Sequence, residues 1–357
     1  MTSRMTRREF VGTFGATVAA ALAVEMGGAA PAFAEDRMTV SLTGGVFGQT
    51  LRRFFVQEPG LEKEIGSSVA FDDSAIQGVR AAKTIAKCGN PDFTCVQLQN
   101  VEAVQLAEGG CIQGYDLGVV TNYGDLFPIT REPPRPGMEA FFGGALMFIA
   151  GAVWNTKHAT KPEKWHDLLA SKYKGKVGIP SAAWFGQSWL NAVNIALGGN
   201  EASYEPAFAF LTELKKNNPV IMASPDLAVR AFEREEIVIA PFWNGRCFKM
   251  QETGVPVQIA YLPGTLQVAD GFVIAKGTKF TAGANRLVNN SFDPALQLKV
   301  SRALGYPPSN AKAVLPADIA HYAVPTEAMA NLVRLDSAMV SRHRDAFADR
   351  WNRILFG

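Results

Sequence analysis

The side chains that most often catalyse reactions do not form a recognisable motif in this sequence. No G-x-S-x-G, H-E-x-x-H or P-loop pattern occurs in the 357 residues, so the nucleophile, the zinc ligands and the phosphate loop that these patterns supply are missing. Four histidines are scattered along the chain, at His158, His166, His321 and His343. We therefore expect no catalytic residue, no cofactor and no metal site, and an enzyme is a disfavoured class of function.

The cysteines are the other reactive side chains, and they lie at Cys88, Cys95, Cys111 and Cys247. None of them forms a C-x-x-C pair, and the histidines do not cluster with them, which disfavours a zinc site. Four cysteines allow three full disulfide pairings, which spacing alone does not distinguish. Cys88 with either Cys95 or Cys111 is the nearest candidate pair, and Cys247 is then left as a buried thiol.

Composition indicates a soluble globular chain of one or two domains. Hydrophobic residues make up 48% of the sequence and charged residues 19%, enough apolar material for two ordinary cores. The formal net charge is +2, from 35 basic and 33 acidic residues, and no block of like charge occurs. This balance disfavours nucleic acid and anionic lipid as partners.

The first 34 residues have the pattern of an export signal. Arg7 and Arg8 precede an apolar pair, as in twin-arginine signals, and an Ala- and Gly-rich stretch follows. The apolar stretch at residues 11–24 is shorter than the roughly 20 residues that cross a bilayer, so it is not an anchor. Ala32-Phe33-Ala34 fits a signal-peptidase site. We expect cleavage near Ala34 and a periplasmic protein, in which disulfides persist.

The remaining chain alternates short apolar strands with amphipathic helices, which predicts an α/β fold with mostly parallel sheets. A long apolar run at residues 141–154 is broken by glycines, and we interpret it as a buried strand that leaves one domain for another. Other strands are expected at residues 38–42, 67–71, 93–98, 177–179, 237–240, 257–261 and 272–274. Helices are expected at residues 49–57, 75–87, 101–107, 188–197, 205–216, 227–235, 282–291, 294–304 and 327–348.

Three segments carry distinctive motifs. Residues 161–177 contain P-x-x-W-x-D-L followed by K-Y-K-G-K-V, residues 235–245 contain E-I-x-x-A-x-x-W-N-G, and residues 293–310 contain D-P-x-x-Q followed by G-Y-P-x-x-N. In this order and spacing they resemble the spermidine/putrescine-type periplasmic solute-binding proteins of ABC transporters. The matches lie between Asn90 and Ala320, so the resemblance covers most of the chain after the signal.

The resemblance implies the type II periplasmic-binding-protein fold, in which two α/β lobes are joined by crossing strands and bind a solute in the cleft between them. Lobe 1 is then expected at residues 35–145 plus about 265–292, and lobe 2 at residues 146–264 plus about 293–357. The expected partners are a small-molecule ligand and the ABC permease of the inner membrane. We expect a monomer.

In such a fold the ligand contacts the loops that follow strands, where polar groups and aromatic walls are exposed. Asp270, Trp243 and Tyr306 match a family carboxylate, a family aromatic residue and a family tyrosine. The full set of candidate ligand-binding residues is Phe47, Gln97, Gln99, Ser181, Trp184, Phe185, Trp243, Arg246, Asp270 and Tyr306.

The match to the polyamine-binding relatives is partial. The family carboxylate of the first loop falls near Val46, and the family acidic pair falls within residues 181–185, which contain no acid. A single acid cannot neutralise the several ammonium groups of a long polyamine, because each unpaired buried charge costs several kcal/mol. A smaller amine, an amino-acid-like zwitterion or an organic acid fits better, and Arg246 would decide for an anion.

Other interpretations remain open from the sequence. Trp184 and Trp243 can be core residues, Arg246 can form a surface salt bridge, and Asp270 can cap a turn. A ferric-ion-binding protein of the same architecture is disfavoured because no adjacent tyrosine pair occurs. A periplasmic ligand sensor, which reports to a receptor instead of a permease, is the remaining alternative.

Overall fold

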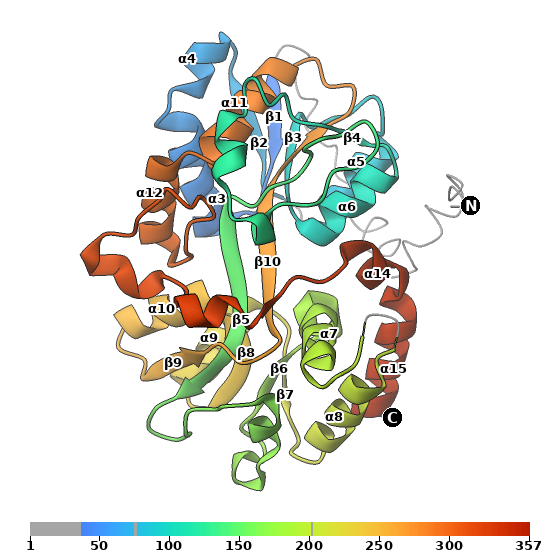
Figure 1. Cartoon of the computed structure of the whole chain (residues 1–357), viewed down its shortest axis with the longest axis vertical. Helices are drawn as coiled ribbons and strands as arrows, with labels where there is room; N and C mark the ends of the chain where they lie inside the picture. The colour runs from blue at the N-terminus through green and yellow to red at the C-terminus, as the bar shows by residue number, and fades with distance from the viewer. Residues whose placement is uncertain (1–36, 75–76, 201–202) are drawn as a thin grey trace. The chain divides into compact units, whose positions relative to one another are not determined.

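The computed structural model describes residues 37–74, 77–200 and 203–357 (Figure 1). The predicted signal peptide and its cleavage site near Ala34 lie outside the described residues. The chain divides into two compact units, and each is formed from separate stretches of sequence. Unit 1 consists of Met1–Met147, Ala269–Ala303 and Pro308–Val314. Unit 2 consists of Phe148–Val268, Leu304–Pro307 and Leu315–Gly357.

Three neighbouring strands of unit 1 are parallel, and an antiparallel strand lies next to them on one side. Strand β1 (Met38–Ser41) lies between β2 (Val69–Asp72) and β3 (Cys95–Gln99), and both are parallel to it. The C-terminal part of β10 (Thr265–Ala275) then pairs antiparallel with β3 and with the short β4 (Ile112–Gln113). This antiparallel pairing brings a distant part of the sequence beside the end of β3.

The helices of unit 1 form two groups around this sheet. In one group α5 and α6 pack on each other and on β3, and in the other α4 and α11 pack on each other and on η1 (Figure 1). The helices and helical turns are α3 (Gly45–Leu51), η1 (Arg52–Gln57), α4 (Leu61–Ile65), α5 (Gln77–Ala86), α6 (Asn100–Glu108), η2 (Thr121–Asp125), η3 (Pro128–Thr130), α11 (Thr281–Ser291) and α12 (Pro294–Leu304).

Helical structure after β1 begins earlier than the predicted helix at residues 49–57. Helix α3 starts at Gly45, and η1 continues it with a wider π-helical turn. Gly48 allows this early start, because a Cβ atom there would lie 1.8 Å from the carbonyl oxygen of Thr43. Only glycine therefore lets the first turn of α3 fold back onto the loop that follows β1.

Helix α12 belongs to unit 1, whereas the sequence analysis assigned residues 293–357 to the second lobe. Gln297 is fully buried, and its Nε2 donates to the carbonyl oxygen of Ser291 and to Ser309 Oγ, both at 2.9 Å. Its Oε1 accepts from the backbone nitrogens of Ser309 and Asn310. The conspicuous Gln and Asn of the third sequence motif therefore fasten α12 to the segment at Pro308–Val314.

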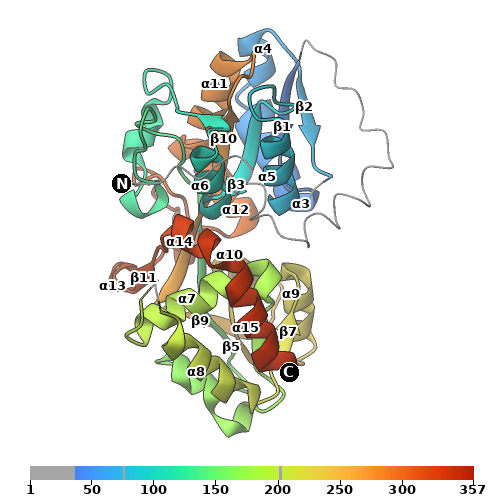
Figure 2. The ribbon, with the colours of Figure 1, turned by 90° about the vertical axis from the view of Figure 1, so that its right-hand side faces the viewer.

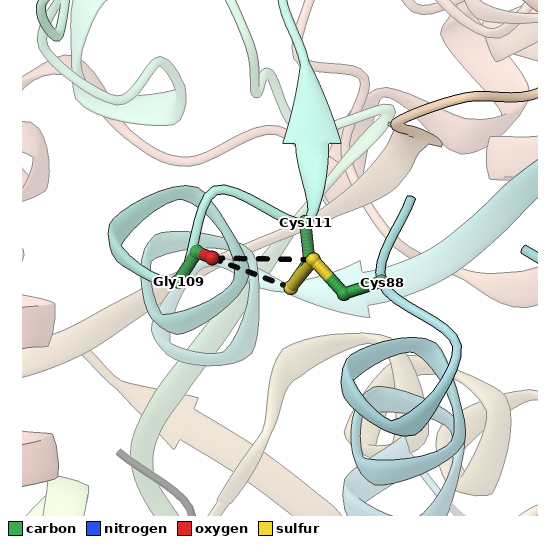
Figure 3. The surroundings of a disulfide bond; sticks show 3 residues. All are labelled: Cys88, Gly109 and Cys111. Atoms are coloured by element: carbon green, nitrogen blue, oxygen red, sulfur yellow. Dashed lines mark hydrogen bonds between the residues drawn. A yellow bond between two sulfur atoms is a disulfide. The ribbon is translucent and has the colours of Figure 1, made fainter. Parts of the chain in front are cut away.

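A disulfide bond ties the end of α5 to the start of β4 (Figure 3). It joins Cys88 and Cys111, whose Cα atoms are 4.8 Å apart. Cys95 and Cys247 are buried free thiols, and burial raises the pKa of each well above its usual range. The pairing of Cys88 with Cys111, one of the two nearest candidate pairs, is confirmed, and so is Cys247 as a buried thiol.

The strands of unit 2 do not form the mostly parallel sheet that the alternation predicted. Strand β5 (Leu146–Asn155) pairs antiparallel with β8 (Ile239–Trp243) and with β9 (Val257–Ala260). Parallel pairing is found between β6 (Gly178–Pro180) and β7 (Val220–Met222). The apolar run at residues 141–154 largely forms β5, which is buried at every position and passes from unit 1 into unit 2. The α/β class and this crossing strand are confirmed.

Helices surround the strands of unit 2 as well. No helix in the described part of the chain is both long enough and apolar enough to span a bilayer. The helices and helical turns are η4 (Trp165–Leu169), η5 (Ser171–Tyr173), η6 (Ala182–Gly186), α7 (Gln187–Ala196), α8 (Glu205–Lys215), α9 (Pro225–Glu233), α10 (Asn244–Glu252), η7 (Ala317–Tyr322), α13 (Thr326–Met329), α14 (Ser337–Arg342) and α15 (Arg344–Phe356).

The prediction of one long helix at residues 327–348 is wrong. The chain forms α13, then extends as β11 (Leu332–Val333), which pairs in parallel with Thr265 and Leu266, and becomes helical again in α14 and α15. Strand pairing, a tertiary contact, overrides the local helical pattern here. Figure 2 shows α15 beside α8, where the ring of Phe347 lies 5.0 Å from that of Phe208.

Candidate functional site

The ten candidate residues fall into two sets, one in each unit. Unit 1 holds Phe47, Gln97, Gln99 and Asp270, and unit 2 holds Ser181, Trp184, Phe185, Trp243, Arg246 and Tyr306. Six of the ten belong to two clusters. We call Thr43, Arg80, Gln97 and Asp270 the acid cluster, and Phe148, Trp184, Phe185, Trp243 and Tyr306 the aromatic cluster.

Asp270 lies where β10 passes the end of β3. It is opposite Gln99 in the antiparallel register, and Phe272 is opposite Gln97. The Asp270 side chain is 4% exposed, and both of its carboxylate oxygens accept from Gln97 Nε2, at 2.7 and 2.6 Å. The buried Asp270 carboxylate is thus hydrogen-bonded to the side-chain amide of Gln97, which lies 173 residues earlier in the sequence.

Gln97 is fully engaged at both ends of its amide. Its Oε1 accepts from the backbone nitrogen of Thr43 at 2.9 Å, from Thr43 Oγ1 at 2.8 Å and from Arg80 Nη2 at 3.1 Å. Its side chain is 1% exposed. The prediction that Gln97 contacts a ligand stays untested, but in this structure its hydrogen-bonding atoms join the loop after β1 to Asp270.

Arg80 anchors the other side of Gln97. Its guanidinium has no exposed surface and donates from Nε and Nη2 to the carbonyl oxygen of Gln97, at 3.2 and 3.0 Å. Nη2 also donates to Thr43 Oγ1 at 3.2 Å. Sequence reasoning missed Arg80, because an arginine in the predicted helix at residues 75–87 is most often exposed to solvent.

Burial dominates the electrostatics of the acid cluster. Loss of water raises the pKa of Asp270 to about 7, while the hydrogen bond from Gln97 and the charge of Arg80 lower it and Glu102 raises it. Desolvation likewise lowers the pKa of Arg80 to about 10, against the nearby charges of Asp270, Glu102 and Asp72. Asp270 is therefore poised between its neutral and charged forms near neutral pH.

The two other candidates of unit 1 are less buried. Gln99 is the last residue of β3, directly before α6, and its side chain is half-buried. Phe47 is half-buried in α3, next to Val46, which is 73% exposed. Val46 is thus an exposed apolar residue at the place where the polyamine-type motif has a carboxylate.

The aromatic cluster of unit 2 consists of closely packed rings. The centroids of Phe185 and Trp243 are 4.3 Å apart, and those of Phe148 and Tyr306 are 4.1 Å apart. An edge-to-face contact of 5.8 Å between Phe148 and Trp243 joins the two pairs. Trp184 stands perpendicular to Phe185 at 4.6 Å. Such contacts add to the apolar burial that holds each ring.

Two glycines make room for Tyr306. A Cβ atom on Gly245 would lie 2.6 Å from Tyr306 Cδ1, so the ring rests directly on the backbone of α10. Gly305 has a φ of +80°, a conformation that favours glycine, and the turn it makes presents the tyrosine. The W-N-G and G-Y-P motifs therefore pack against each other through Gly245 and Tyr306. Phe148, which sequence reasoning took only as part of a buried strand, completes this contact.

The loop that carries Trp184 and Phe185 is tightly folded. The Ser181 carbonyl oxygen accepts hydrogen bonds from the backbone nitrogens of Trp184 and Gly186. The backbone nitrogen of Ser181 donates to the carbonyl oxygen of Met222. Phe185 interrupts η6 with φ −135° and ψ 15°. This bend turns Phe185 inward, where it is 5% exposed, while Trp184 stays half-buried.

Arg246 forms a surface ion pair. Its Nη1 lies 3.4 Å from Asp226 Oδ1, at the first turn of α9, and the Arg246 side chain is 38% exposed. An exposed pair of this kind contributes little to stability. The salt-bridge interpretation of Arg246 is therefore the one that the observed contact favours.

In residues 37–74, 77–200 and 203–357, no three His, Cys, Asp or Glu side chains gather in a way that could hold a metal ion. His158 pairs with Glu235, and the other three histidines pack against aromatic rings. A pocket of about 370 Å³ in unit 1 contains none of the ten candidates and is lined by Leu117, Val120, Thr121, Tyr123, Gly124, Arg131, Pro134 and Glu139.

Comparison with known proteins assigns the family. The model of the bacterial extracellular solute-binding proteins matches residues 77–326, which is more than half of the chain. The chain belongs to this family. The matched range includes both clusters except Thr43, so the buried carboxylate and the packed rings lie within the part that defines a solute-binding protein.

Relatives of known name and structure agree with this family. The spermidine/putrescine-binding periplasmic protein 1 of Haemophilus influenzae is 24% identical over 274 residues, which cover 74% of this chain and 73% of that protein. A solved GABA receptor is 20% identical, with a TM-score of 0.75, over 90% of this chain and 98% of its own. An ABC transporter structure from Clostridium perfringens is 21% identical, with a TM-score of 0.74, over 89% and 100%. The predicted type II periplasmic-binding-protein fold is confirmed.

Proposed function

We propose that this solute-binding protein is the periplasmic component of an ABC importer, and that it binds one small polar metabolite. The observation that carries the proposal is the acid cluster, in which a single carboxylate is buried and hydrogen-bonded beside Gln99. Family membership supports the binding role. Export through the predicted signal and delivery to an inner-membrane permease follow from that role and are part of the proposal.

The solute is best matched by a small amine or an amino-acid-like zwitterion. A carboxylate has about four acceptor positions, and the one NH₂ group of Gln97 that donates to the two Asp270 oxygens leaves acceptor positions for further donors. An ammonium group supplies such donors together with a compensating charge.

A long polyamine fits less well than a molecule with one ammonium group. The acid cluster contains one carboxylate, and the aromatic cluster contains none. Among the relatives, one is named for spermidine and putrescine and another for GABA, which carries one amine and one carboxylate. We propose that this chain resembles the second in its solute class.

The proposal is tested by a thermal-shift screen of the protein that starts at Glu35. The panel contains amines, amino acids, phosphonates, small organic acids and ferric ion. A solute that binds only the folded state raises the melting temperature, by an amount that grows with its concentration relative to Kd. Amines or amino acids are expected to give the largest shifts. A panel without any shift, or consumption of a shifting compound, contradicts the proposal.

Asp270→Ala is the matched variant for the compound that gives the largest shift. If Asp270 pairs with an ammonium group, the loss raises Kd by at least roughly tenfold, about 1.4 kcal/mol or more. Isothermal titration calorimetry measures this change, and Arg246→Ala is the control because its ion pair lies at the surface. An unchanged Kd in Asp270→Ala removes the amine hypothesis.

A further inference from the structure

The acid cluster contains a device that the family resemblance does not predict. Gln97 was expected to contact the solute, yet both ends of its amide are occupied by the protein. Arg80, which has no exposed surface, is bound to both the backbone and the side chain of the same glutamine. A cation and an anion are thus linked through one neutral amide in the interior of unit 1.

The orientation of the Gln97 amide is determined by its neighbours. Thr43 and Arg80 both supply donors to one end, so that end must be the carbonyl oxygen. The NH₂ group is therefore directed to Asp270, where it lies within 2.7 Å of both carboxylate oxygens. A reversed amide would place donors against donors and an oxygen against the carboxylate, which costs at least two buried hydrogen bonds.

The same contacts act on the charge of Asp270. A buried carboxylate tends to bind a proton, because burial disfavours its charged form. A donor to the carboxylate and a nearby cation oppose that tendency, and here these are Gln97 and Arg80. The other charged groups that act on the cluster are Glu102 from α6, which opposes the charge of Asp270, and Asp72 from β2, which acts on Arg80.

We propose that Gln97 and Arg80 are positioning residues that hold the Asp270 carboxylate in one orientation and favour its charged form before any solute binds. Gln97 does not contact the solute itself. Because Thr43 is bonded to the same amide, the loop that precedes Phe47 is held by the same contacts. The inference rests on the proposed function only in assigning Asp270 to the solute.

The test measures the ionisation of Asp270 in the absence of any solute. Protein labelled with ¹³C at the aspartate carboxyl carbons is titrated by NMR, and Asp270→Asn identifies the Asp270 signal by its disappearance. The wild-type signal is expected to titrate near pH 7. Gln97→Glu has the same shape and still accepts from Thr43 and Arg80, but it replaces the donor to Asp270 with an acceptor. Its titration is expected to move to higher pH.

Two further variants separate positioning from a merely structural role. Gln97→Met removes the donor without adding charge, and it is also expected to move the Asp270 titration to higher pH, by less than Gln97→Glu. Glu102→Gln removes a charge that opposes ionisation, so its titration is expected to move to lower pH. If one Gln97 variant does not fold, the other still decides the question. Unchanged titration of Asp270 in a folded Gln97 variant overturns the proposal.

The outcome is independent of the solute screen. A titration that shifts as described supports the positioning role even if no compound in the panel binds. A compound that binds wild-type protein, combined with an unshifted Asp270 titration in Gln97→Glu, leaves the proposed function intact and removes this inference.

Discussion

The acid cluster and the aromatic cluster are held together by different forces. In the acid cluster, directional hydrogen bonds join Thr43, Arg80, Gln97 and Asp270, and the charge of its carboxylate changes near neutral pH. In the aromatic cluster, rings pack within 4.1–5.8 Å of one another, and its five residues include no carboxylate, amine or imidazole. The comparison teaches that the acid cluster should respond to pH and the aromatic cluster only to changes of shape.

The largest expected effect is a loss of packing in the aromatic cluster. Trp243 is 3% exposed and contacts Phe148 and Phe185. Trp243→Ala leaves a cavity and is expected to lower the free energy of unfolding of unit 2 by about 3–5 kcal/mol. Chemical denaturation measures this loss, with Trp243→Phe as the milder control. An equal loss in both variants would mean that volume is not what the cluster requires.

The second effect concerns pH and belongs to unit 1. The pKa of Asp270 is raised from 3.8 to about 7. Between these two pH values the folded state therefore holds a proton that the unfolded state has lost. Its stabilising contribution is complete below pH 4 and is lost as the pH rises through about 7, by an amount on the order of 4 kcal/mol. Denaturation curves of wild type and Asp270→Asn at pH 4 to 8 measure it as a difference, which Trp243→Phe should leave unchanged.

A covalent tie also distinguishes the two units. Cys88 and Cys111 are joined in unit 1, whereas Cys247 in unit 2 is a free thiol. Replacing both Cys88 and Cys111 by serine removes the cross-link between residues that are 23 positions apart in the sequence. This change is expected to lower the free energy of unfolding by about 3 kcal/mol. Dithiothreitol should then affect wild type and Cys247→Ala alike and leave the double variant unaffected. Loss of the dithiothreitol effect in Cys247→Ala would contradict the Cys88–Cys111 disulfide.

The smallest effect is expected at Arg246, which lies on the same helix as the Gly245 that supports Tyr306. Its partner Asp226 is 73% exposed at the side chain. Arg246→Ala should therefore change the stability of unit 2 by less than about 1 kcal/mol and leave Kd for an amine unchanged. Calorimetry with a bound amine and with a small organic acid checks this. A loss of affinity for the acid alone would return Arg246 to the binding residues.

Local patterns were sufficient to predict much of the fold. The strands at residues 38–42 and 93–98 and the helices at residues 205–216 and 294–304 agree with β1, β3, α8 and α12 within a few residues. These segments have a clear period and strong start or stop residues. The segment at residues 327–348 failed because its central pairing partner, Thr265, lies far away in the sequence.

The candidate site was harder to predict for the same reason. Asp270 and Tyr306 could be chosen from motifs, but the role of Gln97 depends on Asp270, 173 residues away, and on Arg80. A buried arginine cannot be told from an exposed one by its local sequence, since both lie on amphipathic helices. Phe148 was hidden in an apolar run in which every residue is buried. Sequence periodicity does not predict which side chains distant in the sequence form hydrogen bonds with each other.

The discontinuous composition of the two units has a consequence for biosynthesis. The free edge of β3 is covered only when β10 arrives, some 170 residues later, and unit 1 still needs the segment Pro308–Val314 after that. A growing polypeptide on the ribosome therefore carries an unpaired strand edge through about half of translation, a state that invites aggregation. Neither the first 147 residues nor the middle of the chain, expressed alone, contains the parts required to complete its own core.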